Sequence, residues 1–381
     1  MEITLKEIAN IVSDKNIDYI ASVCTPWHVN SLKATINRLE IEAGQQLKGV
    51  VLINSHAISG YLVDESYLDN LECDVYYFKH NINIKQKIKL QTEVFLTFCF
   101  LKESSSTNMI YVISPNEPSY DILTKIIKDN KRSAISILID EGIGIYVTSK
   151  KEWAKVKIRE SKAISTKIML WISTRILDVI YMYKLRKNNM VKDYFLMKKD
   201  IHNKYITNDK MVMSYRNTIE KSIKNYDKIN IIYKKYIIYS TQLFSEKWRL
   251  YEIEILKKIK EICENYNIEL IIKPHPRDKQ HIYEDNGFNI INEKNISQEI
   301  YLYRLDRKPL FILGYNSTTL ITGKVINNVE TIGIGELLFK NKGIDKEIIE
   351  RYRQFESKFD GIINYVHNYE EFEKILVDRA I

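Results

Sequence analysis

Ile271-Ile272-Lys273-Pro274-His275-Pro276-Arg277 joins an apolar run, residues 268–272, to a histidine that stands between two prolines. Each proline fixes its own φ angle and disfavours helical geometry in the residue before it, so His275 has little backbone freedom. Lys273 and Arg277 place two cations near the imidazole, and such cations hold phosphates or carboxylates. The stretch predicts a strand that ends in a catalytic or binding histidine; a proline-rich turn with a surface histidine is the alternative.

The first half of the chain alternates short β-branched runs with longer stretches of helical periodicity. The expected strands are residues 19–24, 50–54, 74–78, 109–114 and 133–139. The expected helices are residues 27–45, 86–101 and 120–129. This alternation predicts a doubly wound α/β domain, in which ligands bind beyond the carboxyl ends of the strands.

A second α/β pattern begins at residue 236. Its expected strands are residues 236–239, 268–272, 310–313 and 329–334. Its expected helices are residues 246–266, 297–305, 320–325, 346–359 and 370–378. A chain of 381 residues is also too long for one hydrophobic core. We therefore predict an N-terminal domain at residues 1–205, a linker at 206–235 and a C-terminal domain at 236–381.

The composition limits the classes of partner. A net charge of +8 favours anionic partners such as nucleotides, acidic sugars or an anionic membrane. The sequence shows no zinc-finger spacing and no aromatic RNA-binding motif, so no nucleic-acid partner is expected. The four cysteines form no CxxC pair, which indicates thiols in a reducing compartment. Without a signal-peptide pattern or an apolar run of transmembrane length, we expect a cytoplasmic protein.

Residues 151–190 form a basic amphipathic segment. Ten Lys/Arg against three Asp/Glu give it a charge of +7, most of the excess of the whole protein. Its apolar residues follow helical spacing, but Arg175 and Asp178 interrupt them and argue against a membrane span. Two interpretations stay open. The segment packs on its own domain or on a second copy of the chain, or it makes a peripheral contact with the anionic inner face of the cell membrane.

Two predicted strand ends in the first half carry polar groups. Thr25-Pro26-Trp27-His28 combines a helix N-terminus with an imidazole, which suits an anion or a sugar hydroxyl; the alternative is a Trp and a His that pack as a helix start. Asp140-Glu141-Gly142 places two carboxylates after a buried strand, and the glycine allows a ligand close to the backbone. Neighbouring carboxylates repel, so one of them should have a raised pKa and suit proton abstraction. A solvated acidic turn is the alternative.

Two strand ends in the second half carry hydroxyls and amides. Asn316-Ser317-Thr318-Thr319 follows a strand as a cluster of helix-capping residues, whose hydroxyls and free backbone N–H groups can bind a phosphate. A plain helix cap is the alternative. Ser240-Thr241-Gln242 follows the first strand of this half in the same way.

The ordered set Asp140-Glu141-Gly142, His275-Pro276 and Ser317-Thr318 resembles the three motifs of bacterial sialyltransferases. In the lipooligosaccharide sialyltransferase and capsule polysialyltransferase types, an acidic pair before glycine precedes a His-Pro pair and then paired Ser/Thr residues. Here 135 residues separate Asp140 from His275, and 42 separate His275 from Ser317. The stretch Thr-Pro-Trp-His is also similar to the start of these enzymes. With its two α/β patterns, the chain is expected to adopt the GT-B fold, two Rossmann-like doubly wound domains that face a central cleft.

The resemblance implies inverting transfer of sialic acid from CMP-sialic acid to a bacterial surface glycan, with no metal and no cofactor. Glu141 or Asp140 would take the proton of the acceptor hydroxyl, and we favour Glu141 because it lies further out of the strand. His275 would protonate or hydrogen-bond the leaving phosphate. The expected donor-binding residues are Lys273, Pro276, Ser317, Thr318, Asn316, Ser240, Thr241 and Gln242, and the expected acceptor- or sugar-binding residues are His28 and Gly142.

Other functions fit parts of the pattern. A GT-B transferase that uses CMP-Kdo or CDP-glycerol would share the His-Pro pair, although a CDP-glycerol polymerase would not need the acid pair. A non-catalytic nucleotide-sugar-binding scaffold of capsule assembly is the alternative from a different class. The sequence leaves open the acceptor, the linkage, the choice between one transfer and polymerisation, and the oligomeric state.

Overall fold

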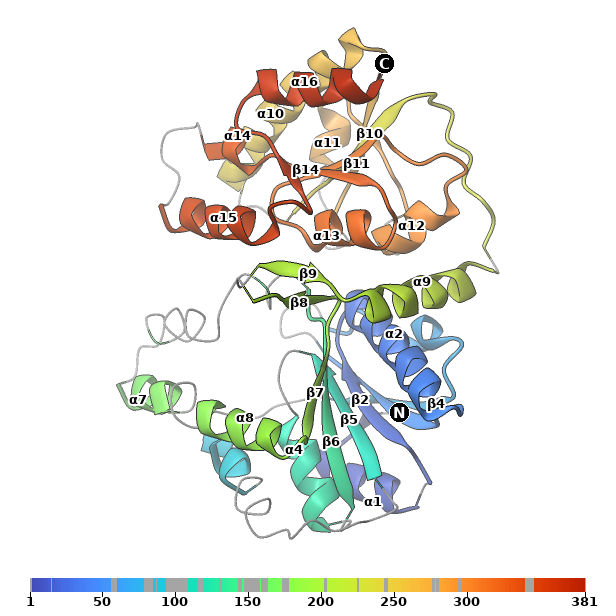
Figure 1. Ribbon diagram of the computed structural model, residues 1–381, viewed down its shortest axis with the longest axis vertical. Helices are drawn as coiled ribbons and strands as arrows, with labels where there is room; N and C mark the ends of the chain where they lie inside the picture. Colours follow the sequence, from blue (N-terminus) through green and yellow to red (C-terminus); the bar gives the residue numbers. More distant parts are fainter. Residues whose placement is uncertain are drawn as a thin grey trace. The chain divides into compact units, whose positions relative to one another are not determined.

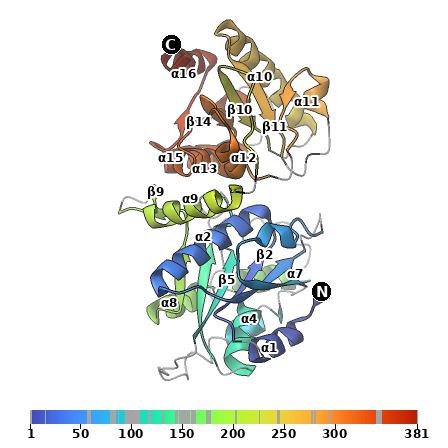
Figure 2. The same ribbon diagram turned by 90° about the vertical axis from the view of Figure 1, so that its right-hand side faces the viewer.

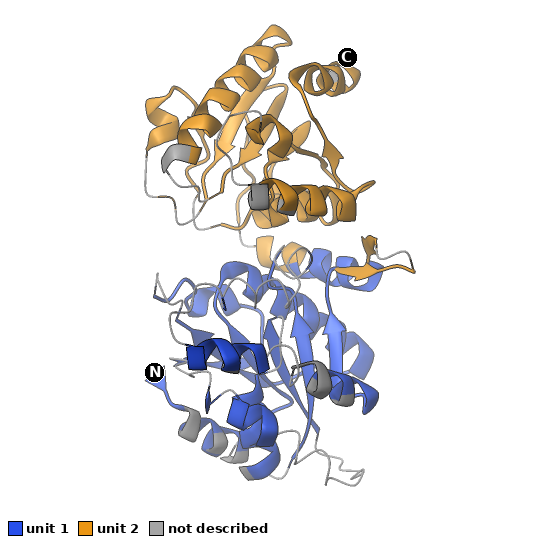
Figure 3. Cartoon of the chain, turned by 90° about the vertical axis from the view of Figure 1, so that its left-hand side faces the viewer, with its two compact units in different colours: residues 1–196, 208–218 blue, residues 197–207, 219–381 orange. Residues whose placement is uncertain are grey.

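The computed structural model describes residues 2–14, 16–55, 60–78, 85–86, 88–93, 109–115, 119–129, 132–142, 146, 158, 164–172, 178–201, 204–224, 226–242, 246–275, 278, 281–293, 296–339 and 346–380. The chain divides into two compact units (Figure 3). The first comprises Met1–Leu196 and Asn208–Thr218, and the second comprises Met197–Thr207 and Ile219–Ile381. Each unit has its own parallel sheet and its own hydrophobic core.

The first unit is built on a seven-stranded parallel sheet in the order β1-β4-β3-β2-β5-β6-β7. Figure 1 shows β5, β6 and β7 of this sheet side by side. Its strands are β1 (Glu2–Ile3), β2 (Tyr19–Val23), β3 (Gly49–Asn54), β4 (Cys73–Phe78), β5 (Met109–Pro115), β6 (Ser133–Ile139) and β7 (Val191–Tyr194). From β2 the chain adds β3 and β4 on one side and then β5, β6 and β7 on the other. This is the strand order of a Rossmann fold, which reverses between β2 and β5.

Helices cover the sheet of the first unit because its central strands are apolar on both faces. All five residues of β2 are buried. Helices α1 (Leu5–Asp14), α4 (Tyr120–Thr124) and α8 (Asp178–Lys187) join one hydrophobic cluster with the strands, and α1 and α4 lie side by side (Figure 2). Helix α2 (Pro26–Ala43) contacts β2 and β6. Thr25 caps its start and Gly44, with a φ of 69°, ends it, as their residue types favour.

The second unit repeats the pattern with a six-stranded parallel sheet in the order β12-β11-β10-β13-β14-β15. Its strands are β10 (Tyr236–Ser240), β11 (Glu269–Lys273), β12 (Asn289–Ile290), β13 (Phe311–Gly314), β14 (Glu330–Gly333) and β15 (Asn364–Tyr365). The order is again that of a Rossmann fold, and it reverses between β10 and β13.

Two sets of helices flank this second sheet. One set shares a hydrophobic cluster with the strands: α10 (Glu246–Asn265), α11 (Ile282–Asp285), α14 (Gly335–Phe339), α15 (Lys346–Phe359) and α16 (Tyr369–Ala380). The other set consists of α12 (Gln298–Arg304) and α13 (Thr318–Val325), which contact each other. Helix α13 also contacts β13 and β14. These two Rossmann-like units confirm the predicted α/β fold class of GT-B type; a cleft shared by the units stays a prediction.

Residues 197–224, largely expected as a linker, contain regular structure. Strands β8 (Met197–Lys199) and β9 (Tyr205–Thr207) pair antiparallel, and α9 (Asp209–Ile223) follows. The division of the units assigns residues of α9 up to Thr218 to the first unit and the rest to the second. The segment is polar overall, but α9 carries an apolar stripe. Its residues Met211, Val212, Tyr215 and Ile219 are buried.

The basic segment 151–190 divides into parts with different environments. Helix α8 packs on the first unit through buried Leu185 and partly buried Met182. Helix α7 (Ile164–Ile172) instead exposes Ile164 by 75%, Ile168 by 54% and Trp171 by 51%. Among the described helices, none combines the length and the apolar character needed to cross a bilayer.

Candidate active site

In the second unit, three neighbouring strands bring residues that the sequence singled out to one edge of the sheet. Strand β10 pairs with β11 on one side and with β13 on the other, so that Ser240 lies opposite Lys273 and Gly314. The strands are parallel, and the segments that follow them therefore leave from the same edge. The strand order reverses here, which is where Rossmann folds bind their ligands.

The backbone of His275 is held on both sides at this edge. Its N–H donates to the Thr241 hydroxyl at 2.8 Å, and the N–H of Thr241 donates to the carbonyl oxygen of Lys273 at 3.1 Å. The carbonyl oxygen of His275 accepts the N–H of Asp278 at 2.8 Å. The histidine is partly exposed. These bonds fix the point from which the imidazole extends, while Pro276 lies outside the described residues.

Ser240 and Gln242 connect the end of β10 to neighbouring segments. The buried Ser240 hydroxyl donates to Oε1 of Gln298 at 2.6 Å, which holds α12. Nε2 of Gln242 donates to the carbonyl oxygen of Asn316, which follows β13. Both side chains thus connect the edge of the sheet to other segments of the same unit, and their contact with a donor stays a prediction.

Ser317 is the N-cap of α13. Its hydroxyl oxygen accepts the N–H of Thr319 at 3.3 Å and the hydroxyl of Thr319 at 2.9 Å. Asn316, Ser317 and Thr318 are partly exposed. The first N–H groups of a helix and its dipole favour an anion at such a position. The predicted phosphate-binding residues therefore lie after β13, the strand next to β10.

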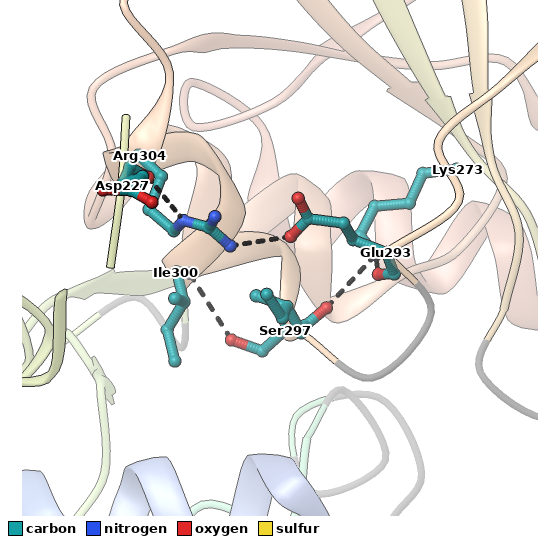
Figure 4. Close-up of polar contacts among 7 residues, drawn as sticks. Asp227, Lys273, Glu293, Ser297, Ile300 and Arg304 are labelled. Atoms are coloured by element: carbon teal, nitrogen blue, oxygen red, sulfur yellow. Dashed lines mark hydrogen bonds and ion pairs between the residues drawn. The ribbon is translucent and has the colours of Figure 1, made fainter. Parts of the chain in front are cut away.

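Lys273 is buried, unlike an ordinary surface cation. Its ammonium donates to the carbonyl oxygens of Ile296 at 3.2 Å and Glu293 at 3.4 Å, and burial lowers its pKa. Figure 4 shows this loop beside the ion pair between Arg304 and Glu293, at 2.7 Å. Lys273 therefore holds the segment before α12, and its contact with a donor phosphate stays a prediction.

In the first unit, the carboxylate of Asp140 is fully buried after β6. It accepts the backbone N–H of Leu196 at 2.6 Å, the hydroxyl of Tyr146, and the hydroxyl of Tyr215 at 3.4 Å. Loss of solvation raises its pKa to about 6, although the three hydrogen bonds oppose this shift. Asp140 thus links the end of β6 to the chain after β7 and to α9.

Glu141 has the opposite environment, because it is exposed. Gly142 follows with a φ of 116°, a conformation that glycine adopts far more readily than other residues. The turn places one carboxylate inside the unit and the next at its surface. Of the two candidate bases, Glu141 is the one that solvent reaches.

His28 is buried at the start of α2 beside this acidic turn. Its Nδ1 accepts the N–H of Cys24 at 3.2 Å, and its own N–H from the backbone donates to the Thr25 hydroxyl at 3.2 Å. The ring also forms a hydrogen bond with the backbone of Glu141. Burial lowers the pKa of His28 to about 4, so the ring is neutral at physiological pH. His28 therefore supports the acidic turn, and contact with an acceptor or sugar stays a prediction.

Several residues at these edges escaped the sequence analysis. They are the partners of the singled-out groups: Tyr146, Leu196, Tyr215, Arg249, Glu252, Asp278 and Gln298. The sequence does carry a signal for Arg249 and Glu252, because these two charged residues occupy the otherwise apolar inward face of α10. Across the described ranges, no group of three His, Cys, Asp or Glu side chains is arranged to hold a metal ion. Metal independence itself stays a prediction.

Several solved structures are similar to this protein over nearly the whole chain, at low sequence identity. The α/β-galactoside α-2,3-sialyltransferase of Photobacterium phosphoreum is 15% identical, with 91% of this chain and 97% of that chain covered and a TM-score of 0.42. The UDP-GlcNAc 2-epimerase of Methanocaldococcus jannaschii is 14% identical, with 95% and 92% covered and a TM-score of 0.45. The MnaA protein of S. aureus in complex with UDP is 10% identical, with 89% and 90% covered and a TM-score of 0.46.

No curated protein matches the sequence at a significant level. The family model of alpha-2,8-polysialyltransferase (POLYST), in contrast, matches residues 19–335. This range includes β2, both strand edges described above and the start of α14. The chain therefore belongs to the alpha-2,8-polysialyltransferase family of glycosyltransferases.

Proposed function

We propose that this protein transfers sialic acid from CMP-sialic acid to a hydroxyl group of a bacterial surface glycan, with inversion and without a metal ion. The observation that carries the proposal is the edge of the second sheet, where His275 and the start of α13 follow the two strands that flank β10. An imidazole and a helix N-terminus at such strand ends suit the phosphate of a nucleotide donor. Family membership supports sialic acid as the transferred sugar.

The donor half of the reaction uses the second unit. The bond that breaks joins the anomeric carbon of sialic acid to a phosphate oxygen of CMP. His275 donates a proton or a hydrogen bond to that oxygen as it leaves. The N–H groups at the start of α13, with Asn316, Ser317 and Thr318, bind the phosphate and stabilise its charge. Thr241 and Gln242 line the pocket for the nucleotide.

The acceptor half uses Glu141. Its carboxylate takes the proton of the acceptor hydroxyl while the acceptor oxygen attacks the anomeric carbon on the face opposite CMP. The exposure of Glu141 and the complete burial of Asp140 support this choice between the two carboxylates. In this mechanism Asp140 and His28 hold the turn on which Glu141 lies.

Product analysis tests the donor and the reaction. The purified protein is incubated with CMP-sialic acid, CMP-Kdo or CDP-glycerol and with a panel of galactoside and sialoside acceptors. We expect CMP release and sialylated product from CMP-sialic acid alone, and the length of the product distinguishes one transfer from polymerisation. Turnover of CMP-Kdo or CDP-glycerol in preference to CMP-sialic acid would contradict the proposed donor. Binding of CMP without any turnover would favour the scaffold alternative.

Two further conditions test the mechanism. Glu141→Gln should remove transfer while CMP still binds, because the amide cannot accept the proton. Excess EDTA should leave the rate of transfer unchanged, since the proposed chemistry uses protein groups alone. Strong inhibition by EDTA that added Mg²⁺ or Mn²⁺ reverses would show that the transfer depends on a metal.

We also propose that α7 makes a peripheral contact with an anionic membrane. Ile164, Ile168 and Trp171 lie on one face of α7, at helical spacing, and each is at least half exposed. The surrounding sequence carries the +7 charge noted above. An apolar helix face within a basic segment complements a surface of acidic lipids.

Liposome flotation tests this contact. The protein should float with vesicles of phosphatidylglycerol at low salt, release as salt rises and ignore vesicles of phosphatidylcholine. The variant Ile164→Ser/Ile168→Ser/Trp171→Ser should lose flotation, whereas Leu250→Ser, at a residue of α10 that is 57% exposed, should retain it. Unchanged flotation of the triple variant would show that α7 does not make the membrane contact. A change in its oligomeric state would instead assign the face to a second copy of the chain.

A further inference from the structure

The first turns of α10 carry buried charges that the mechanism above does not use. Arg249 and Asp278 are each 4% exposed and Glu252 is 1% exposed. Arg249 forms an ion pair with Asp278. The two oxygens of Glu252 each accept a hydroxyl, from Tyr239 at 2.6 Å and from Tyr283 at 2.6 Å. The cluster joins α10 to β10, to α11 and to the segment that follows β11.

This cluster connects to His275 on both sides of its backbone. On one side, Asp278 is held by the arginine of α10 and donates its N–H to the carbonyl oxygen of His275 at 2.8 Å. On the other side, the N–H of His275 donates to the hydroxyl of Thr241, which stands two residues after Tyr239. Tyr239 is held in turn by Glu252. Both connections end on α10, one helical turn apart.

Stability alone does not account for an ion pair at this place. Removing two charges from water offsets most of their attraction, so a buried pair contributes less than well-packed apolar side chains of similar size. Further along the same helix, the inward face is apolar at Leu256, Ile259 and Cys263. Among the described side chains of α10, the buried charged ones, Arg249 and Glu252, lie in its first turns, near the loop of His275. A directional bond there fixes the orientation of the loop, which apolar packing does less well.

We infer that Arg249 and Asp278 are positioning residues that hold His275 in place for the transfer step. The inference rests on the proposed function, because it takes His275 as the group that acts on the leaving phosphate oxygen. A displacement of about 1 Å at a catalytic group can lower a rate by about 100-fold. The phosphate-binding residues at α13 follow a different strand, so loss of the pair should affect the chemical step more than donor binding.

Steady-state kinetics with CMP-sialic acid test the inference. The variants are Arg249→Met, Asp278→Asn and the double variant, in the full-length protein. Both single variants should lower kcat by about 10- to 100-fold and change the donor KM by no more than about threefold. The control Arg353→Met removes an ion pair between α15 and Glu336, at 3.0 Å, and should keep the kcat of the wild-type protein.

The double variant separates positioning from stability. It removes both charges of the ion pair, so its melting temperature should recover relative to the single variants. Its kcat should stay low, because the directional bond is still absent. Recovery of kcat together with stability would overturn the inference. If Asp278→Asn does not fold, Arg249→Lys replaces it: lower kcat at unchanged KM supports the inference, and unchanged kcat overturns it.

A measurement without turnover separates this inference from the proposed function. If the wild-type protein does not use CMP-sialic acid, the proposed function fails. The inference is then decided by NMR of the imidazoles in the full-length protein, with the seven histidines labelled and His275 assigned through His275→Ala. Asp278→Asn should shift or broaden the signals of His275 and leave those of His28 unchanged. Unaltered His275 signals would overturn the inference.

Discussion

The edge of the first sheet and the edge of the second hold their candidate catalytic side chains in different ways. In the first, the anchor Asp140 and the exposed Glu141 are neighbours in the sequence. In the second, His275 is fixed through its backbone by Thr241, 34 residues away, and by Asp278. The acidic turn is therefore anchored through the side chain of Asp140, which accepts hydrogen bonds from Leu196 and Tyr215, whereas the histidine is anchored through its own backbone.

The two anchors also differ in charge. Burial raises the pKa of Asp140 to about 6, although hydrogen bonds from two hydroxyls and a backbone N–H oppose this shift. Asp278 instead forms a buried ion pair with Arg249. The first anchor should therefore respond to pH near neutrality, while the second is held by a charged side chain. Each substitution proposed below changes one of the two edges and leaves the other intact.

The largest effect is expected from His275→Ala. This change removes the group that we propose to act on the leaving phosphate, so kcat for transfer should fall by about 100-fold or more, while circular dichroism and melting temperature stay close to those of the wild-type protein. The slow hydrolysis of CMP-sialic acid without acceptor should fall as well. Glu141→Gln, at the other edge, should remove transfer and leave that hydrolysis. Near-normal turnover by His275→Ala would exclude the histidine from the mechanism.

The positions of the singled-out groups were predictable because parallel strands end at a common edge. Strands β2 to β6, β10, β11, β13 and β14 followed from β-branched runs, and the capping role of Ser317 followed from N-cap chemistry. The partners of these groups were not predictable in the same way. Tyr215 belongs to a stretch that was expected as a linker, and Arg249 contacts a residue 29 positions later. Long-range pairs of this kind follow from packing, which no local pattern encodes.

A smaller effect is expected from Asp140→Asn, in the dependence of stability on pH. The pKa of Asp140 is higher in the folded protein than the ordinary value of 3.8, so the folded state binds this proton more tightly than the unfolded chain. Its contribution to stability is present at low pH and is lost as pH rises toward 6. Asparagine does not titrate. Between pH 4.5 and 7, the unfolding free energy of the variant should therefore rise relative to that of the wild-type protein, by about 2 kcal/mol.

Urea denaturation at several pH values measures this difference. The range starts above the pKa of about 4 of the neighbouring His28, so that this ring is mainly neutral in both folded proteins. Glu330→Gln provides a control of opposite sign, because hydrogen bonding to Lys324 lowers the pKa of Glu330 in the folded state. A difference between Asp140→Asn and wild type that does not change with pH would show that Asp140 is ionised throughout.

The smallest effect is expected from Lys273→Met, which distinguishes two roles for this cation. If the ammonium only supports the segment before α12, the variant should melt at a lower temperature, because two partly buried carbonyl oxygens lose their donor, and its kcat should change by no more than about threefold. If the ammonium reaches the donor phosphate, as the sequence predicted, kcat should fall by about tenfold or more and CMP should bind more weakly. Calorimetric titration with CMP, combined with kcat at a temperature where both proteins are folded, decides between the two. The structural contacts favour the first outcome, in which the second edge depends on Lys273 for its shape and on His275 for its chemistry.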